Sequence, residues 1–172
     1  MTMDIMNTSK EVFAKTYARF PVVFERGSGC TLWDINGKSY TDFMAGIAVC
    51  NLGHAHPRIV KALAAQAETL WHVSNLFYTT PQTQLAQMLV ARSFADRVFL
   101  CNSGSEANEA AIKLARKYFK DRGEKNRFRI ISMEGSFHGR TMASLSATGQ
   151  DKVKNGFEPV LNRKCDFFHP LC

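Results

Sequence analysis

Residues 102–108 (Asn-Ser-Gly-Ser-Glu-Ala-Asn) constrain this chain most, because they join an apolar run, residues 97–101, to the start of a helical pattern. Ser103 is placed as the N-cap of that helix, and Glu106 three residues later completes the S-x-x-E pattern of a capping box. Gly104 allows the backbone to come close to a ligand, toward which the first N–H groups of the helix point. The stretch predicts an anion pocket suited to a phosphate monoester. A well-capped helix with nothing bound is the alternative.

A second loop follows the helical pattern and another strand-like run, residues 127–133. Strand, helix and strand with short connections predict a βαβ unit, whose two loops lie at the same carboxyl edge of a parallel sheet. The second loop carries an aromatic ring, an imidazole and a guanidinium, on Phe137, His138 and Arg140. The two loops together predict an α/β fold with a site for a flat, phosphorylated cofactor and an anionic substrate.

These same motifs carry a family resemblance. The sequences of residues 102–116 and of residues 136–141 (Ser-Phe-His-Gly-Arg-Thr) resemble those of the class III aminotransferases, which are fold type I pyridoxal-phosphate enzymes. Within that family the chain is most similar to the acetylornithine branch. The resemblance runs from about Tyr17 to Pro159, and it is also carried by residues 26–34, 40–43, 46–49, 52–57 and 74–78.

The resemblance implies a domain organisation and a cofactor. Residues 1–56 would form an N-terminal segment with a small antiparallel sheet, and residues 57–160 would begin the large cofactor-binding domain. The cofactor would be pyridoxal 5'-phosphate. The fold class implied is therefore the N-terminal part of a fold type I α/β protein, with the start of a mainly parallel sheet.

The resemblance also assigns roles to four residues. The backbone amides of Gly104 and Ser105 would bind the cofactor phosphate, and Phe137 would pack on the pyridine ring, for which an aromatic face is suited. Arg140 would bind the α-carboxylate of the substrate through its bidentate guanidinium fork. His138 has no assigned role and is expected to pack within its loop.

Two groups that pyridoxal chemistry needs have no candidate in this sequence. Pyridoxal chemistry requires a lysine that holds the cofactor aldehyde as a Schiff base, and an acidic partner for the pyridine nitrogen. In the family both lie downstream of the Phe-His-Gly-Arg motif, in a chain more than twice this length. No catalytic residue is therefore assigned, and the polypeptide is expected to be inactive alone.

The family pattern is lost after about Val160. Residues 161–172 are expected to be an aberrant tail that belongs to no domain. A shifted reading frame or a gene remnant would explain this loss, and native truncation is the alternative.

For the parent enzyme, the resemblance implies transfer of the δ-amino group of N-acetylornithine to 2-oxoglutarate, a step of arginine biosynthesis, by a cytoplasmic homodimer. Sister specificities for ornithine, succinylornithine, succinyldiaminopimelate or 4-aminobutyrate stay open. Arg140 weakens the last of these, because it favours substrates that carry an α-carboxylate. A non-catalytic remnant that pairs with a full-length homologue is a third reading.

Composition excludes several other classes. The 172 residues are 45% hydrophobic and 22% charged, near the average of globular proteins, and no apolar run is long enough to span a bilayer. The net charge of +7 is scattered over helix ends and turns without aromatic residues between, which does not favour nucleic-acid binding. The five cysteines are irregularly spaced, which does not predict a disulfide framework and favours a reducing, cytoplasmic setting. The isolated pair His54 and His56 does not predict a metal site.

The remaining patterns predict local structure. An antiparallel sheet is expected over residues 26–49, with Asn36-Gly37 as its hairpin turn. A helix is expected to start at Pro57, with apolar residues on one face, and another at Thr80, with Leu85, Met88 and Leu89 turned inward. Residues 71–78 are expected to form a loop, and residues 1–9 a ragged lead-in.

Overall fold

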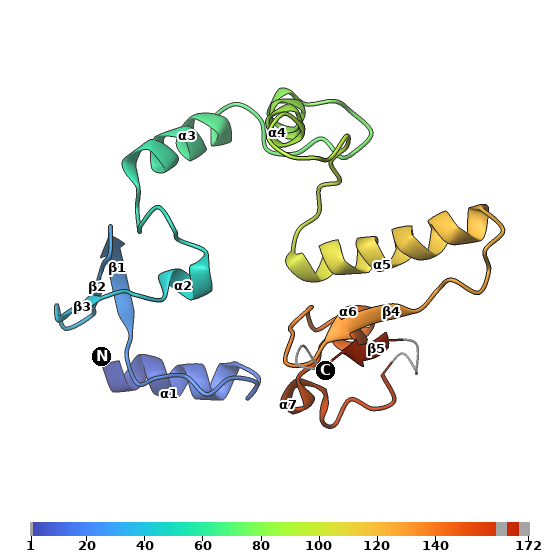
Figure 1. The fold of residues 1–172 in the computed structure, drawn as a ribbon. Helices are drawn as coiled ribbons and strands as arrows, with labels where there is room; N and C mark the ends of the chain where they lie inside the picture. The colour runs from blue at the N-terminus through green and yellow to red at the C-terminus, as the bar shows by residue number, and fades with distance from the viewer. Residues whose placement is uncertain (1, 161–164, 169–172) are drawn as a thin grey trace. The chain divides into compact units, whose positions relative to one another are not determined.

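The computed structural model describes residues 2–160 and 165–168. The chain divides into two compact units, Met1–Phe77 and Tyr78–Cys172, which are described separately below (Figure 1). The domain boundary implied by the resemblance, between residues 56 and 57, stays a prediction.

The first unit contains a three-stranded sheet and helices. In chain order its elements are α1 (Thr2–Val12), β1 (Phe24–Ser28), β2 (Thr31–Asp34), β3 (Ser39–Thr41), α2 (Ala45–Ala48) and α3 (Pro57–Ala67). The strands pair antiparallel in the order β1-β2-β3, which confirms the predicted sheet. The predicted ragged lead-in is wrong, because helix α1 begins at Thr2.

The predicted Asn36-Gly37 turn is confirmed between β2 and β3, where Gly37 adopts a φ of +82°. The Asp34 carboxylate closes this turn, because it accepts hydrogen bonds from the Asn36 N–H at 2.9 Å and the Lys38 N–H at 3.0 Å. The Tyr40 hydroxyl donates to the same carboxylate at 3.0 Å. Desolvation opposes ionisation, but these hydrogen bonds outweigh it and lower the pKa of Asp34.

The sheet ends earlier than predicted, at Thr41 instead of residue 49. The reason is Asp42, whose carboxylate accepts hydrogen bonds from the N–H groups of Met44 at 2.8 Å and Ala45 at 2.9 Å and so turns the chain into α2. The same carboxylate lies 2.6 Å from His54 Nε2. The hydrogen bond with His54, followed by those with the two N–H groups, lowers the pKa of Asp42.

The two predicted proline-started helices are confirmed. Helix α3 begins at Pro57 in the first unit, and helix α4 (Thr80–Val90) begins with Thr80-Pro81 in the second. Their apolar faces, however, are not buried: Leu63 is 69% exposed on α3, and Leu85 is 47% exposed on α4. The predicted inward face of α4 is therefore wrong for the described residues. No neighbouring element among them packs closely enough on the apolar face of α3 or of α4 to bury it.

The second unit is built around a parallel strand pair. After α4 it contains α5 (Gly104–Asp121), β4 (Ile130–Met133), α6 (Met142–Ala147), α7 (Asp151–Lys154) and β5 (Cys165–Phe168). Strand β4 pairs in parallel with β5, and α6 packs against both α5 and the strand pair (Figure 1). Four residues of the expected aberrant tail, residues 161–172, thus form a strand, and the other residues of the tail lie outside the described part.

The predicted βαβ unit around α5 is wrong in one strand. Residues 97–101 form no strand, and Phe99 is 74% exposed. An apolar run becomes a strand only when a neighbour completes its hydrogen-bond ladder, and among the described residues no strand pairs with this run. The βαβ connection that does form runs from β4 through α6 and α7 to β5.

The best-buried part of the described chain is α6. Leu145 and Ala147 are 4% and 2% exposed, and their neighbours Ser144, Ser146 and Thr148 are buried as well. Because this helix directly follows the Phe-His-Gly-Arg loop, its burial fixes the loop in place.

Candidate functional site

The start of α5 is capped as predicted. Ser103 has the extended backbone of an N-cap, and its Oγ accepts a hydrogen bond from the Glu106 N–H at 3.2 Å. The Glu106 carboxylate accepts from the Asn102 N–H at 2.7 Å, one residue before the N-cap N–H that a standard capping box uses. The N–H groups of Gly104 and Ser105 have no acceptor among the described residues.

The space beside Gly104 is open. A Cβ built on Gly104 would meet no atom within 4 Å. The positive end of an 18-residue helix favours an anion at this place. Gly104 and Ser105 therefore fit the phosphate of the predicted cofactor, through the amide donors that a phosphate needs.

The structure brings the second loop against this helix start. Ser105 Oγ lies 3.1 Å from Thr141 Oγ1 and 2.8 Å from Ser144 Oγ. One turn further along α5, Asn108 Nδ2 donates to the His138 carbonyl at 2.7 Å. The side chain of Ser105 is thus engaged with the second loop, which leaves its backbone N–H as the donor for a ligand.

Glu109 links the same two segments with a charge, and sequence reasoning missed it. Its carboxylate accepts hydrogen bonds from the Thr141 hydroxyl and from the N–H groups of Ala143 at 3.0 Å and Ser144 at 3.2 Å. The bond from Thr141, and secondarily those from the two N–H groups, lower the pKa of Glu109 despite desolvation. Its only sequence signal was the i, i+3, i+4 spacing of Ser105, Asn108 and Glu109, which puts three polar side chains on one helix face.

Gly139 permits the close approach of the loop. Its φ is +130°, and an added Cβ would overlap Ser105 Oγ and lie 2.6 Å from Ser144 Oγ. The glycine of the Phe-His-Gly-Arg motif therefore serves packing between the loop and α5, a role the sequence reading did not assign.

The other residues of the motif flank this contact. Phe137 is 55% exposed, and Arg140 is exposed as well, so both side chains are accessible from solvent. His138 is partly buried; its N–H donates to Thr148 Oγ1 at 3.0 Å, and its Nδ1 lies 3.4 Å from Ser136 Oγ. These contacts fit the packing role expected of His138.

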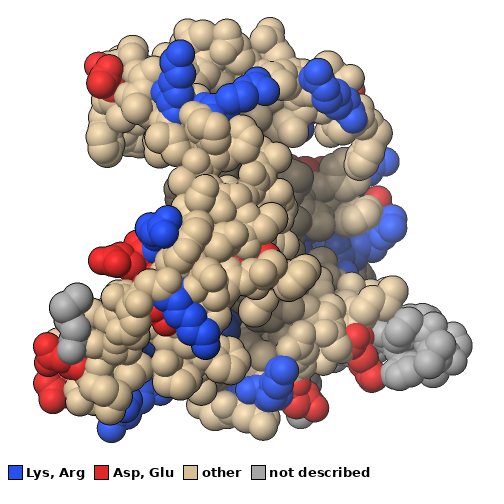
Figure 2. Space-filling model, turned by 90° about the vertical axis from the view of Figure 1, so that its left-hand side faces the viewer, with Lys and Arg blue, Asp and Glu red and all other residues tan. Residues whose placement is uncertain are grey.

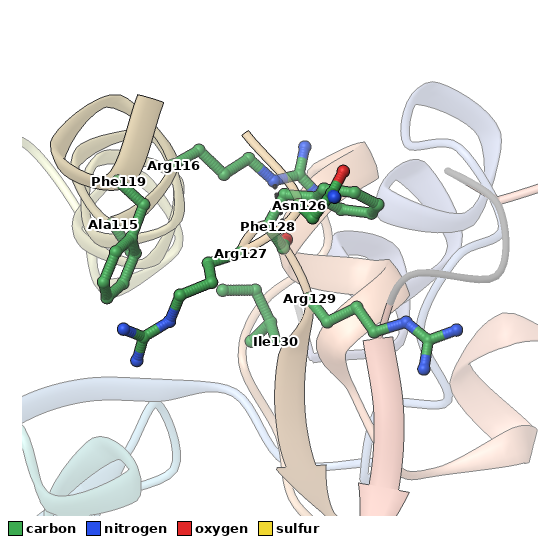
Figure 3. Close-up of a pocket in the computed structure, with 8 residues that line it drawn as sticks. All are labelled: Ala115, Arg116, Phe119, Asn126, Arg127, Phe128, Arg129 and Ile130. Carbon is green, nitrogen blue, oxygen red and sulfur yellow. Dashed lines mark hydrogen bonds between the residues drawn. The ribbon is translucent and has the colours of Figure 1, made fainter. Parts of the chain in front are cut away.

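A pocket of about 330 Å³ lies elsewhere on the second unit. It is lined by residues of the second half of α5 and of the segment that leads into β4, and Figure 3 draws them: Ala115, Arg116, Phe119, Asn126, Arg127, Phe128, Arg129 and Ile130. The Arg127 guanidinium lies 4.1 Å from the centre of the Phe119 ring and forms an ion pair with Glu124 at 2.8 Å. None of the four predicted site residues lines this pocket, so it is separate from the helix start.

Basic and acidic side chains are interspersed on the face that Figure 2 shows, without a continuous patch of one sign. Over the described ranges, no group of three or more His, Cys, Asp or Glu side chains is placed to hold a metal ion. Within the same residues, no helix combines the length and the apolar character needed to cross a membrane.

Known proteins are similar to this chain over most of its length. Acetylornithine aminotransferase of Myxococcus xanthus is 50% identical over 159 residues, which is 92% of this chain and 40% of the relative. The enzyme of the same name from Thermosynechococcus vestitus is 55% identical over 151 residues, 88% of this chain and 37% of the relative. The chain thus spans about 40% of the length of the curated relatives it matches.

Solved structures are likewise similar to most of this chain, which covers about 40% of their length. Ornithine aminotransferase from Toxoplasma gondii ME49 superposes with a TM-score of 0.92 at 31% identity, over 99% of this chain and 40% of that one. A Bacillus anthracis aminotransferase superposes with a TM-score of 0.89 at 31% identity, over 98% and 38%. The fold is therefore that of the N-terminal segment of a fold type I aminotransferase.

The pattern of the family described as aminotransferase class-III matches residues 12–170, a longer stretch than the motifs alone indicated. Enzymes of this family depend on pyridoxal 5'-phosphate. The match covers most of the sequence, and the chain belongs to the class III aminotransferases.

Proposed function

We propose that this chain is the cofactor-phosphate and substrate-carboxylate part of an acetylornithine aminotransferase. The whole enzyme would transfer the δ-amino group of N-acetylornithine to 2-oxoglutarate, in the cytoplasm and as a homodimer. The observation that carries the proposal is the open start of α5, with its two N–H groups, next to the loop that holds Phe137 and Arg140.

Each residue would have a distinct task. The N–H groups of Gly104 and Ser105 would bind the phosphate of pyridoxal 5'-phosphate, Phe137 would cover a face of its ring, and Arg140 would orient the substrate by its α-carboxylate. When bound, the cofactor supplies the electron sink that amino-group transfer needs. The lysine that holds its aldehyde has no candidate in the sequence pattern of this chain, so we expect no turnover from the chain alone.

Sister specificities remain the second candidate. The Toxoplasma gondii relative is named an ornithine aminotransferase, and succinylornithine, succinyldiaminopimelate or 4-aminobutyrate would also fit the family. Arg140 favours the substrates that carry an α-carboxylate, and the identity of 50–55% with acetylornithine aminotransferases favours N-acetylornithine. A non-catalytic remnant is the third candidate.

Cofactor binding can be tested at the helix start. Gly104→Pro removes one N–H donor at a position where proline is tolerated, since Gly104 is the first helical residue and Ser103 before it is extended. A hydrogen bond to a charged group contributes about 1.5–3 kcal/mol, so we expect the affinity for pyridoxal 5'-phosphate to fall roughly 10-fold or more. Gly104→Ala keeps the N–H and is the matched control.

The measurement is a titration followed by the amide NMR signals of residues 104 and 105 in the unsubstituted chain and in Gly104→Ala. In Gly104→Pro, which has no N–H at residue 104, the signal of residue 105 is followed. We expect saturable shifts with pyridoxal 5'-phosphate and with inorganic phosphate, and none with pyridoxal, which has no phosphate. Shifts that are equal for pyridoxal and its phosphate would contradict the assignment. An equal loss in Gly104→Ala would mean that the site needs the space above Gly104 more than its N–H.

Substrate specificity requires the rest of the family's length. The chain would be coexpressed with the remaining part of the Myxococcus xanthus relative, and glutamate formation from 2-oxoglutarate would be measured with each amino donor. We expect activity with N-acetylornithine only in the combination. Preference for another donor would select a sister specificity, and no activity with any donor would favour the remnant.

A further inference from the structure

The polar side chains on one face of α5 all reach the segment after β4. Ser105, Asn108 and Glu109 contact Thr141, His138 and the start of α6 through hydrogen bonds of 2.7–3.2 Å. These contacts join residues that lie 30 to 36 positions apart in the sequence. They are therefore tertiary contacts that fix the loop, residues 137–141, relative to α5.

Glu109 differs from the other two because it carries a charge and receives several donors. The N–H groups of Ala143 and Ser144 are first-turn donors of α6 and cannot be satisfied within that helix. A carboxylate at a helix start gains from the helix dipole, and its hydrogen bonds are stronger than neutral ones. Glu109→Gln would keep the shape of the side chain but remove this charge.

We propose that Glu109 is a positioning residue, which holds the loop that carries Phe137 and Arg140 against the open start of α5. The inference rests on the proposed function for the ligand-binding roles of Phe137 and Arg140. Glu109 touches neither cofactor nor substrate in this role. It acts through Thr141 and the first turn of α6, and its loss loosens the loop while the two free N–H groups of α5 stay in place.

Amide hydrogen exchange of the full chain tests the positioning directly, without any ligand. We expect Glu109→Gln to accelerate exchange at Ala143 and Ser144 at least 10-fold, and Glu109→Asp, which keeps the charge, to accelerate it less. Asp121→Asn is the matched control, because it removes an exposed carboxylate from the other end of the same helix. It should leave exchange at these two amides unchanged.

Ligand titrations then distinguish an effect on the loop from an effect on the N–H groups at the start of α5. Inorganic phosphate needs only the N–H groups of α5, so its affinity should change less than 2-fold in Glu109→Gln. Pyridoxal 5'-phosphate also needs the ring contact from the loop, so its affinity should fall at least 5-fold. If Glu109→Gln unfolds the second unit, Thr141→Val removes the hydroxyl contacts with Glu109, Ser105 and Ser144 but keeps the N–H donors of Ala143 and Ser144 on Glu109, and it should loosen the same loop to a smaller extent.

The outcomes are distinct. Unchanged exchange at Ala143 and Ser144 in Glu109→Gln, or no protection of them in the unsubstituted chain, overturns the inference even if the cofactor binds. Equal losses for phosphate and for pyridoxal 5'-phosphate also overturn it, since they show a general loss of structure. Accelerated exchange in a chain that binds neither ligand supports the positioning by Glu109 and removes the proposed function instead.

Discussion

Gly139→Ala is the substitution whose cost follows most directly from the geometry. Backbone strain and steric overlap both contribute to the loss of stability. The backbone φ of +130° is one that side-chain-bearing residues rarely adopt, and holding a residue there costs about 1–3 kcal/mol. The new methyl group would also overlap Ser105 Oγ and lie 2.8 Å from Ser105 Cβ, and overpacking of this kind costs about 1–3 kcal/mol.

The two terms together predict a loss of about 2–6 kcal/mol in the local stability of the loop and α6. At 1.4 kcal/mol for each factor of ten, even the lower limit corresponds to about 30-fold faster amide exchange. Both tryptophans, Trp33 and Trp71, lie in the first unit, so their fluorescence does not report on this segment. Hydrogen exchange of residues 144–148 is the suitable assay.

Three other glycines separate the two terms. Gly135→Ala has a φ of +73° but open space, so it tests the backbone alone. In Gly149→Ala the new methyl group would overlap the Met133 carbonyl oxygen without a positive φ, so this variant tests overlap alone. Gly104→Ala has neither and should cost nothing measurable. If Gly139→Ala is no more destabilising than Gly104→Ala, the close packing of the loop on α5 is refuted.

Three further predictions follow from the helix cap, the Asp42–His54 pair and the exposed apolar faces. Ser103→Ala should destabilise α5 by about 1 kcal/mol, seen as faster amide exchange in its first turn, because the Glu106 N–H loses its acceptor; equal exchange would contradict the cap. Asp42 has a lowered pKa, so its contribution to stability is complete above the unfolded value of about 3.9 and is lost as the pH falls through the lower folded value. Asp42→Asn should therefore flatten the fall in the thermal midpoint of the first unit below pH 4, followed by tryptophan fluorescence, and an unchanged slope would exclude this pair as its cause. The chain alone should show a broad thermal transition in circular dichroism, because Leu145 and Ala147 are its buried apolar residues over the described ranges, and a sharp cooperative transition would refute this expectation.

The local structure was predictable where a few neighbouring residues determine it. Ser103 with Glu106, Pro57, Thr80 with Pro81, and Asn36 with Gly37 each specify a helix start or a turn through their own backbone and side-chain chemistry. These elements form as predicted.

The elements that depend on distant partners were harder to predict. Residues 97–101 have the composition of a strand, but no described strand pairs with them. Within the same part of the chain, no element covers the apolar faces of α3 and α4 well enough to bury them. Glu109 looked like an exposed helix residue, because its partners lie more than 30 positions later. Sequence periodicity gives the face of a residue but does not identify the segment that faces it.

The Glu109 carboxylate, which lies at the start of α6, determines which helix start of the second unit can bind an anion. Two helix starts come together in the second unit, and each could attract an anion. At the start of α6, the N–H groups of Ala143 and Ser144 already donate to the Glu109 carboxylate, which therefore competes permanently with any free anion. Of these two helix starts, only that of α5 has N–H groups left to accept an anion. The arrangement thus leaves the two helix starts with one place for a guest anion, at the start of α5.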